Sequence, residues 1–172
     1  MPKNAVILLI RHAEKPDFGP DLTEEGERHA QAYVHFFNNF HLGPRLLKID
    51  ALFAAADSKG SFRPRLTLIP LAAALKLPIQ MPYEDKQIGK MADHLLSKKF
   101  DGKTVLVCWK HSELLPLADA LGATAHLLRP KTQWPLEWPD NQYNWILQIA
   151  YDGSNQIDRA NTYCIRQPAI EY

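Results

Sequence analysis

The feature that most constrains the fold is an unbroken apolar run near the start of the chain, Ala5–Ile10, followed at once by Arg11 and His12. The run is too short to cross a bilayer and is bounded by polar residues, which is typical of a strand buried on both faces of a parallel sheet. Ligands of open α/β sheets bind just beyond the carboxyl ends of the strands. The sequence therefore predicts that Arg11 and His12 lie at a ligand site.

The rest of the chain alternates strand-like with helix-like segments. Further strands are predicted at Asp50–Ala56, Thr104–Trp109 and Gln142–Ala150, and helices after Thr23, after Arg63, over Lys86–Lys99 and over Leu114–Leu121. Asp152–Tyr172 is predicted to be irregular. This alternation predicts one α/β domain over residues 1–172, a sandwich with a mostly parallel central sheet.

Several residues mark where the helices begin, bend and end. Thr23 is the predicted N-cap of the first helix, because carboxylates follow it in the first turn. Pro64 suits the first turn of the next helix, and Pro70 predicts a kink within it. Gly122 is the predicted end of the helix over Leu114–Leu121.

Composition excludes several classes of function. The 172 residues carry a formal net charge of +1 with no dense block of lysine and arginine, which argues against a nucleic-acid partner. We find neither a signal peptide nor a run of transmembrane length, so no membrane association is expected. The two cysteines, Cys108 and Cys164, fit a packing role in a reducing, cytoplasmic protein better than a disulfide scaffold.

A second histidine and a second arginine follow other predicted elements. His111 comes just after the strand Thr104–Trp109, and Arg63 stands at a helix start after the loop of residues 57–62. A single histidine or arginine in such a position is more often an ordinary surface residue than a functional one. Together with Arg11 and His12 they would form a positively charged pocket, and such a pocket suits a phosphate-like dianion, whose oxygens pair with guanidinium groups.

Four segments, in order over residues 4–122, carry a family resemblance. The segment from Leu9 to Pro16 resembles the Arg-His-Gly signature of the histidine phosphatase superfamily, with Ala13 in place of the glycine. The helix start from Leu22 to Ala30, the run from Arg63 to Ala72 and the strand ending in His111 resemble three further motifs of that superfamily. The resemblance implies a three-layer α/β/α sandwich of the phosphoglycerate mutase type. The short chain most resembles the small phosphohistidine phosphatases.

The resemblance also implies roles for the four residues. His12 would be the nucleophile that forms a phosphohistidine, His111 the second catalytic histidine, and Arg11 and Arg63 the groups that bind the substrate phosphate, with Arg65 as the less favoured second arginine. A backbone carbonyl is expected to hold one ring nitrogen of His12, so that the other can attack. The implied enzyme is a metal-independent phosphatase with no cofactor, acting on a small phosphorylated substrate or a phosphoprotein.

The proton donor and the exact reaction stay open. Candidate acids lie around Glu84, Asp85 and Gln87, with Glu113 as another choice. Three rival functions are a phosphoglycerate mutase-type phosphotransferase, an inactive module that only binds a phosphorylated ligand, and a metal hydrolase using His12, Glu14 and His111. The physiological substrate and the oligomeric state are not set by the sequence.

Two groups of residues have alternative interpretations. The aromatic residues in the C-terminal third are expected to cover the edge of the sheet rather than to wall the pocket: Trp134, Trp138, Tyr143 and Trp145. Ser58 and Ser61 would either donate to the phosphate or cap the helix that follows them.

Overall fold

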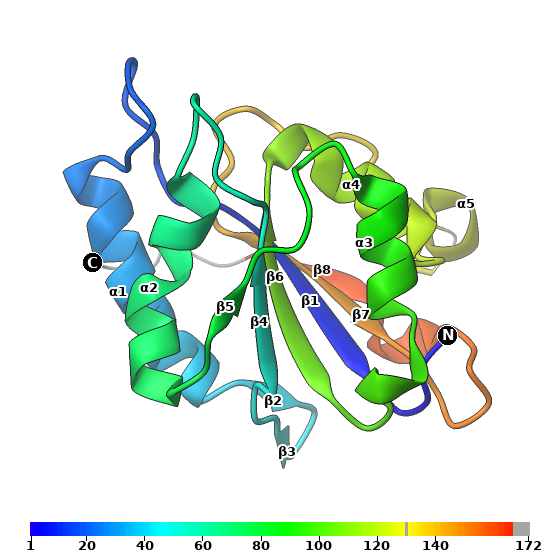
Figure 1. The fold of residues 1–172 in the computed structure, drawn as a ribbon. Coiled ribbons are helices and arrows are strands. Elements are labelled where there is room, and N and C mark those ends of the chain that lie inside the picture. Colours follow the sequence, from blue (N-terminus) through cyan, green and yellow to red (C-terminus); the bar gives the residue numbers. More distant parts are fainter. Residues whose placement is uncertain (130, 167–172) are drawn as a thin grey trace.

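In the computed structural model, which describes residues 1–129 and 131–166, the centre is a six-stranded sheet with the order β5-β4-β6-β1-β7-β8 (Figure 1). Its strands are β1 (Val6–Arg11), β4 (Ala51–Ala54), β5 (Ile79–Gln80), β6 (Thr104–Trp109), β7 (Trp145–Ala150) and β8 (Tyr163–Arg166). Four neighbouring strands of this order run parallel to one another, namely β5, β4, β6 and β1. Strand β7 is antiparallel to both of its neighbours, β1 and β8. The predicted, mostly parallel sheet is confirmed.

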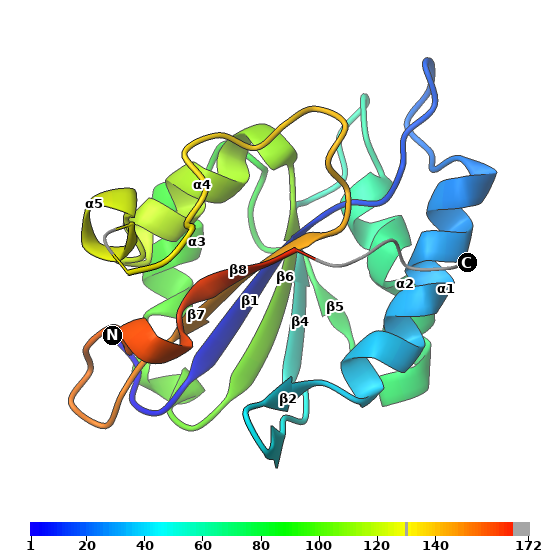
Figure 2. The same cartoon turned by 180° about the vertical axis from the view of Figure 1, so that it is seen from behind.

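Helices cover both faces of this sheet, which gives the three layers expected (Figures 1 and 2). One face carries α1 (Glu24–Asn38) and α2 (Arg63–Leu75), and the other carries α3 (Ile88–Leu95), α4 (His111–Ala120) and the short α5 (Ala125–Leu128). Two 3-10 turns lie at Lys98–Phe100 and Arg159–Asn161. A small hairpin, β2 (His41–Leu42) and β3 (Arg45–Leu46), projects from the end of the sheet opposite the carboxyl ends of the parallel strands.

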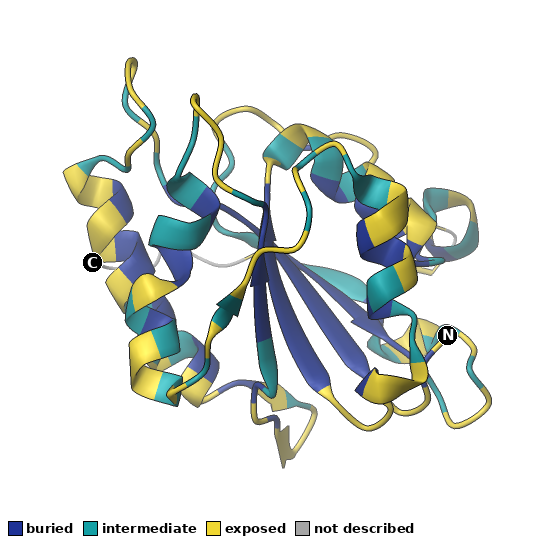
Figure 3. Ribbon diagram, viewed as in Figure 1, coloured by how far each residue is buried: buried dark blue, intermediate teal, exposed yellow. Residues whose placement is uncertain are grey.

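The central strands are buried along their whole length (Figure 3). Successive side chains of a strand point to opposite faces, so β1 contributes to two separate cores. Leu8 and Ile10 pack with residues of α1 and α2, whereas Ile7 and Leu9 pack with residues of α3 and α4. This double burial explains why the run at Ala5–Ile10 is continuously apolar.

The start of α1 is as predicted. Thr23 is the N-cap, and its hydroxyl oxygen accepts a hydrogen bond from the backbone N–H of Gly26 at 3.0 Å. The acidic residues of the first turn face the positive end of the helix dipole, and the buried stripe of the helix faces the sheet. α1 also packs against α2, so the two helices form one layer.

Other element boundaries differ from the predictions. α4 begins at His111 rather than Leu114, and α3 covers only Ile88–Leu95 of the predicted Lys86–Lys99. Pro70 lies inside α2, which continues to Leu75, and the kink expected at this proline stays a prediction.

The C-terminal third also needs correction. β7 begins at Trp145 rather than Gln142, because residues 142–144 form a loop instead. The segment predicted to be irregular contains β8, which pairs with β7 at the edge of the sheet. Residues 167–172 of that prediction lie outside the described residues.

Both cysteines are free thiols, with Cys108 buried in β6 and Cys164 half-buried in β8, as expected for residues that only pack. Within the described parts of the chain, no helix combines the length and apolar character needed to cross a membrane.

Candidate active site

Three of the four predicted site residues line one cavity of about 240 Å³. His12 follows the end of β1, Arg63 is the first residue of α2, and His111 is the first residue of α4. The cavity therefore lies beyond the carboxyl ends of the parallel strands, where the sequence predicts it. Ser58 and Ser61 also line it, and the hydroxyl of Ser61 accepts a hydrogen bond from the N–H of Arg63 at 3.3 Å.

The imidazole of His12 is buried, with 5% of its surface exposed, and is held by the backbone. Its Nδ1 lies 2.7 Å from the carbonyl oxygen of Ala13. A carbonyl can only accept, so Nδ1 carries the proton and Nε2 keeps its lone pair. The expected carbonyl lock on the ring is therefore present, one residue after the histidine.

The electrostatics of the cavity keep this imidazole neutral. Burial lowers the pKa of His12 to about 3, and the hydrogen bond to the carbonyl of Ala13 opposes that change only in part. The positive charges of Arg11 and Arg63 and the neighbouring His111 act in the same direction as burial, and the value of about 3 is the result of all these effects. At neutral pH the ring is therefore uncharged, with Nε2 unprotonated.

The loop after β1 is tied to α2 by Thr67, a residue that sequence reasoning missed. The buried hydroxyl of Thr67 accepts a hydrogen bond from the N–H of Ala13 at 2.8 Å and donates one to the carbonyl of Arg63 at 2.7 Å. One side chain thus connects the residue after His12 to the first residue of α2. The sequence signal for it is a threonine four residues after Arg63, the spacing at which a helical threonine bonds back to the preceding turn.

Arg11 is fully buried and does not line the cavity surface itself. Its Nη1 donates to the carbonyl oxygens of Asp140 and Gln142, the latter at 3.1 Å, and its guanidinium carbon lies 3.8 Å from the centre of the Tyr143 ring. Nε and Nη2 are buried and have no hydrogen-bond partner among the described residues.

Arg63 rather than Arg65 reaches the cavity. Two of its nitrogens donate to backbone carbonyls, Nη1 to Gly19 at 2.8 Å and Nη2 to Gly60 at 3.2 Å, while Nε is buried without a partner in the described structure. Arg65 instead forms an ion pair with Asp57 at 2.9 Å. The geometry therefore favours Arg63, the choice made from the motif.

His111 presents one ring nitrogen to a carboxylate. Its Nε2 lies 2.9 Å from Oδ1 of Asp140, and its Nδ1 is buried with no partner within the described ranges. Burial and the charge of Arg11 lower the pKa of His111, whereas the hydrogen bond to Asp140 and its charge raise it. Asp140 was not singled out in the sequence, because it lies 29 residues from His111 in an irregular segment.

Only two of the candidate proton donors lie at the cavity. Glu84 and Asp85 line the cavity, whereas Gln87 and Glu113 are not among its lining residues. The side chain of Gln87 accepts a hydrogen bond from the N–H of Glu84 at 2.9 Å, so it supports the loop. Asp85 lies 3.7 Å from the ammonium group of Lys110, which lines the cavity together with Lys15 and Arg63.

The aromatic residues of the C-terminal third divide between two roles. Trp134 and Trp138 are buried in the core beside α4, and Trp145 packs against it, as the covering role predicts. Tyr143 is the exception, because its ring lies on Arg11 and its centre is 6.3 Å from that of His12.

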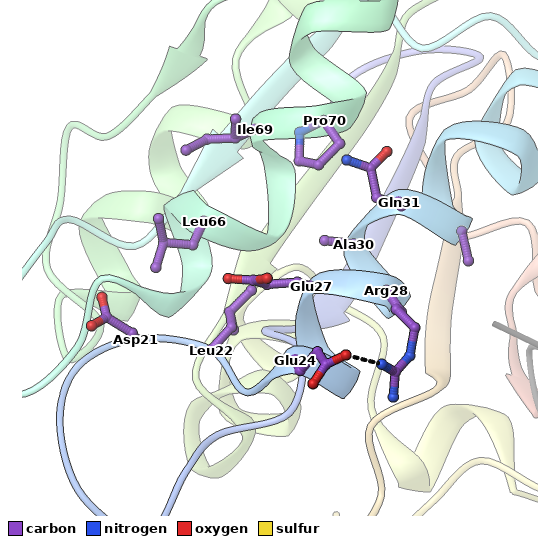
Figure 4. Close-up of a pocket in the computed structure, with 11 residues that line it drawn as sticks. Asp21, Leu22, Glu24, Glu27, Arg28, Ala30, Gln31, Leu66, Ile69 and Pro70 are labelled. Carbon is purple, nitrogen blue, oxygen red and sulfur yellow. Dashed lines mark hydrogen bonds and ion pairs between the residues drawn. The ribbon is translucent and has the colours of Figure 1, made fainter.

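A larger hollow, of about 860 Å³, lies between α1 and α2 (Figure 4). Leu66, Ile69 and Pro70 of α2 form one wall, and Ala30 and the side chains around it on α1 form the other. None of its lining residues is a histidine, and the only ion pair drawn there, Glu24 with Arg28, is exposed. The chemistry therefore points to the smaller cavity.

The metal-hydrolase alternative finds no support in the described residues. No group of three or more His, Cys, Asp and Glu side chains is placed there to hold a metal ion. Glu14, one of the three residues of that hypothesis, pairs instead with the buried ring of His29 at 3.0 Å.

Comparisons with known proteins identify the fold. No family model matches the sequence, and no curated protein matches it. Among solved structures, the chain is similar to the protein histidine phosphatase SixA complexed with tungstate (TM-score 0.56, 19% identity, 88% of this chain and 92% of the other). It is also similar to phosphoglycerate mutase from Plasmodium falciparum (TM-score 0.58, 14% identity, 99% of each chain).

A third similar structure is phosphoserine phosphatase from Entamoeba histolytica in complex with 3-phosphoglyceric acid (TM-score 0.53, 14% identity, 84% of this chain and 90% of the other). These likenesses show that the chain has a phosphoglycerate mutase-like fold. At this level of identity they show the fold alone, so the reaction has to be argued from the site.

Proposed function

We propose that this chain is a phosphatase that hydrolyses a phosphomonoester or a phosphoramidate through a phosphohistidine on His12. The observation that carries the proposal is the neutral imidazole whose Nδ1 is held by the carbonyl of Ala13, beside a cavity surrounded by cations. A neutral imidazole is a nucleophile, and positioned donors stabilise the charge on a transferring phosphoryl group. Fold similarity to known phosphatases is consistent with this reaction.

The first step transfers the phosphoryl group to the protein. Nε2 of His12 attacks phosphorus in line, a P–N bond forms, and the P–O or P–N bond to the leaving group breaks. Arg11, Arg63 and His111 bind the equatorial oxygens, and each such donor is worth about 10²–10³ in rate. Glu84 or Asp85, the acids at the cavity wall, protonates the leaving atom.

The second step releases phosphate. Water attacks phosphorus, the P–N bond breaks, and His12 returns to its neutral form. The carboxylate left by the first step accepts the proton of the water, so the acid is restored. No metal ion takes part in either step, and we expect the rate to be unchanged by a chelator.

The size of the cavity bears on the substrate. At about 240 Å³ it is below the 300–1,000 Å³ typical of pockets that enclose a small molecule. It has room for the phosphoryl group and the atoms next to it, so the remainder of the substrate lies outside. This supports either a small substrate held by its phosphate or a phosphorylated side chain of a protein.

The test is to incubate the protein with a ³²P-labelled aryl phosphate and with a phosphoramidate. We expect release of inorganic phosphate and a labelled protein that is stable to base and labile to acid, as a phosphohistidine is. His12→Asn should abolish both. Arg65→Lys is a matched control, because Arg65 pairs with Asp57 outside the cavity.

Each rival function has a distinct result in this assay. A phosphotransferase would isomerise a phosphoglycerate without releasing phosphate. An inactive binding module would bind phosphate but neither turn over nor become labelled. Hydrolysis that persists in His12→Asn would refute the phosphohistidine mechanism.

A further inference from the structure

The loop that leads into β7 reaches two of the candidate phosphate-binding groups. It passes over the end of the sheet where β1 and β6 finish (gold and orange in Figure 2). Within it, the backbone at Asp140 and Gln142 and the ring of Tyr143 hold Arg11, and the carboxylate of Asp140 holds His111. We call residues 140–143 the strap.

The strap decides which edge of Arg11 is available to a ligand. Nη1 is occupied by two carbonyls, and the Tyr143 ring covers one face of the guanidinium at 3.8 Å. The donors left over are Nε and Nη2, both buried and without a partner in the described part of the chain. Their N–H bonds are parallel on one edge of the group, which is the geometry that binds two oxygens of a phosphate at once.

The strap also bears on the protonation of His111. Nε2 donates to Asp140, so Nδ1 is the nitrogen left to face a phosphoryl oxygen. Nδ1 can donate only if the ring carries both protons. Burial, the largest cause, and the charges of Arg11 and Lys15 hold the pKa of His111 below its ordinary value, and Asp140 opposes that change.

We propose that Asp140 and Tyr143 are positioning residues of this site: Tyr143 holds Arg11 with its two-donor edge toward the phosphoryl group, and Asp140 orients the His111 ring through Nε2 and favours the proton on Nδ1 that a bound phosphoryl group would accept. The assignment rests on the proposed function, because it concerns the same phosphate site. It adds two residues that lie outside every motif of the superfamily resemblance.

The Tyr143 half is tested by binding of inorganic phosphate, measured by calorimetry, which requires no turnover. Tyr143→Leu keeps apolar bulk but removes the ring, and we expect it to weaken phosphate binding about tenfold. Tyr143→Phe keeps the aromatic ring, so its affinity for phosphate should fall clearly less than that of Tyr143→Leu. Asn141→Ala is the matched control, since this exposed neighbour makes no hydrogen bond in the described structure. Equal affinity of Tyr143→Leu and the wild-type protein would overturn the assignment of Tyr143.

The Asp140 half is tested by an NMR titration of the His111 ring in the wild-type protein and in Asp140→Asn. The carboxylate is 95% exposed, so the variant is expected to fold normally. Loss of the negative charge should lower the pKa of His111 measurably. In the active enzyme, the alkaline limb of the pH profile should move to lower pH with it. An unchanged titration would overturn the role of Asp140.

These results are separable from the proposed function. If phosphate binding and the His111 titration respond as expected but no substrate is hydrolysed, the strap assignment stands and the phosphatase proposal fails. If hydrolysis proceeds through His12 while both variants behave as the wild-type protein does, the phosphatase stands and the strap assignment fails. A wild-type protein that binds no phosphate would overturn the assignment of Tyr143.

Discussion

The hydroxyl of Thr67 should be one of the most costly single groups to remove near the site, for both stability and rate. It lies in a fully buried residue and makes two short hydrogen bonds, one from the N–H of Ala13 at 2.8 Å and one to the carbonyl of Arg63 at 2.7 Å. Thr67→Val replaces the hydroxyl by a methyl group of similar size. The volume is kept, so the change isolates the hydrogen bonds.

The expected loss of stability can be worked out bond by bond. Leaving the buried N–H of Ala13 without a partner costs about 1–3 kcal/mol, and losing the bond to Arg63 adds about 1 kcal/mol. The free energy of unfolding should therefore fall by about 2–4 kcal/mol in Thr67→Val. Thr67→Ser keeps both hydrogen bonds and removes one methyl group, at about 1 kcal/mol.

The same substitution should slow the reaction, because Ala13 also supplies the carbonyl that holds Nδ1 of His12. A displacement of about 1 Å at a reacting atom can cost about 10² in rate. We expect kcat to fall by about that factor in Thr67→Val and by much less in Thr67→Ser.

Urea denaturation followed by circular dichroism measures the first effect, and steady-state hydrolysis of an aryl phosphate measures the second. If Thr67→Val were as stable and as active as Thr67→Ser, the hydroxyl would not hold the loop and the reasoning would be wrong.

Three further predictions concern the residues around this loop. Gly26→Ala places a Cβ 2.6 Å from the carbonyl oxygen of Glu14, so it should destabilise the protein by about 1–3 kcal/mol in urea denaturation, whereas Gly89→Ala, with nothing within 4 Å, should not destabilise it. The pKa of His12 is lowered from 6.5 to about 3, so between pH 6.5 and 3 this side chain binds more protons in the unfolded chain than in the folded one. The free energy of unfolding should therefore fall as the pH drops through that range, and it should fall less steeply in His12→Asn. Arg63→Met removes a positive charge, so an NMR titration should show a raised pKa of His12 that stays below its ordinary value, since burial is the larger cause; a pKa that did not rise would contradict the role given to Arg63.

Much of the frame of the site could be predicted from the sequence, because it depends on local patterns. A continuous apolar run marks a strand buried on both faces, and such a strand delivers the residues that follow it to the ligand-binding edge. This reasoning placed His12 and His111 at the ends of β1 and β6, and the motif placed Arg63 at the start of α2. The structure brings those three residues to one cavity.

The residues that hold this frame could not be predicted in the same way. Arg11 bonds to the carbonyl of a residue 129 positions away, and a carbonyl leaves no trace in the sequence because every residue has one. Residues 142–144 directly precede the apolar strand β7 and were predicted as its start, yet the carbonyl of Gln142 accepts from the side chain of Arg11 instead of from a neighbouring strand. β8 was missed because it is a short edge strand, half-buried, with no alternating pattern to mark it.

The arrangement of charge around His12 meets two requirements of phosphoryl transfer with the same groups. A nucleophilic imidazole must be free of a proton on the attacking nitrogen, and a phosphate must be held by positive charge. In the proposed mechanism the guanidinium groups of Arg11 and Arg63 meet both requirements, because each lowers the pKa of His12 and each keeps at least one buried nitrogen without a hydrogen-bond partner among the described residues. Binding a phosphoryl dianion would offset these positive charges and so raise the tendency of the His12 ring to take up a proton. At that stage, however, Nε2 would face phosphorus, and Nδ1 is already protonated and bonded to the carbonyl of Ala13. The carbonyl of Ala13 therefore matters most after the substrate has bound, since it leaves the lone pair of Nε2 as the one free to react.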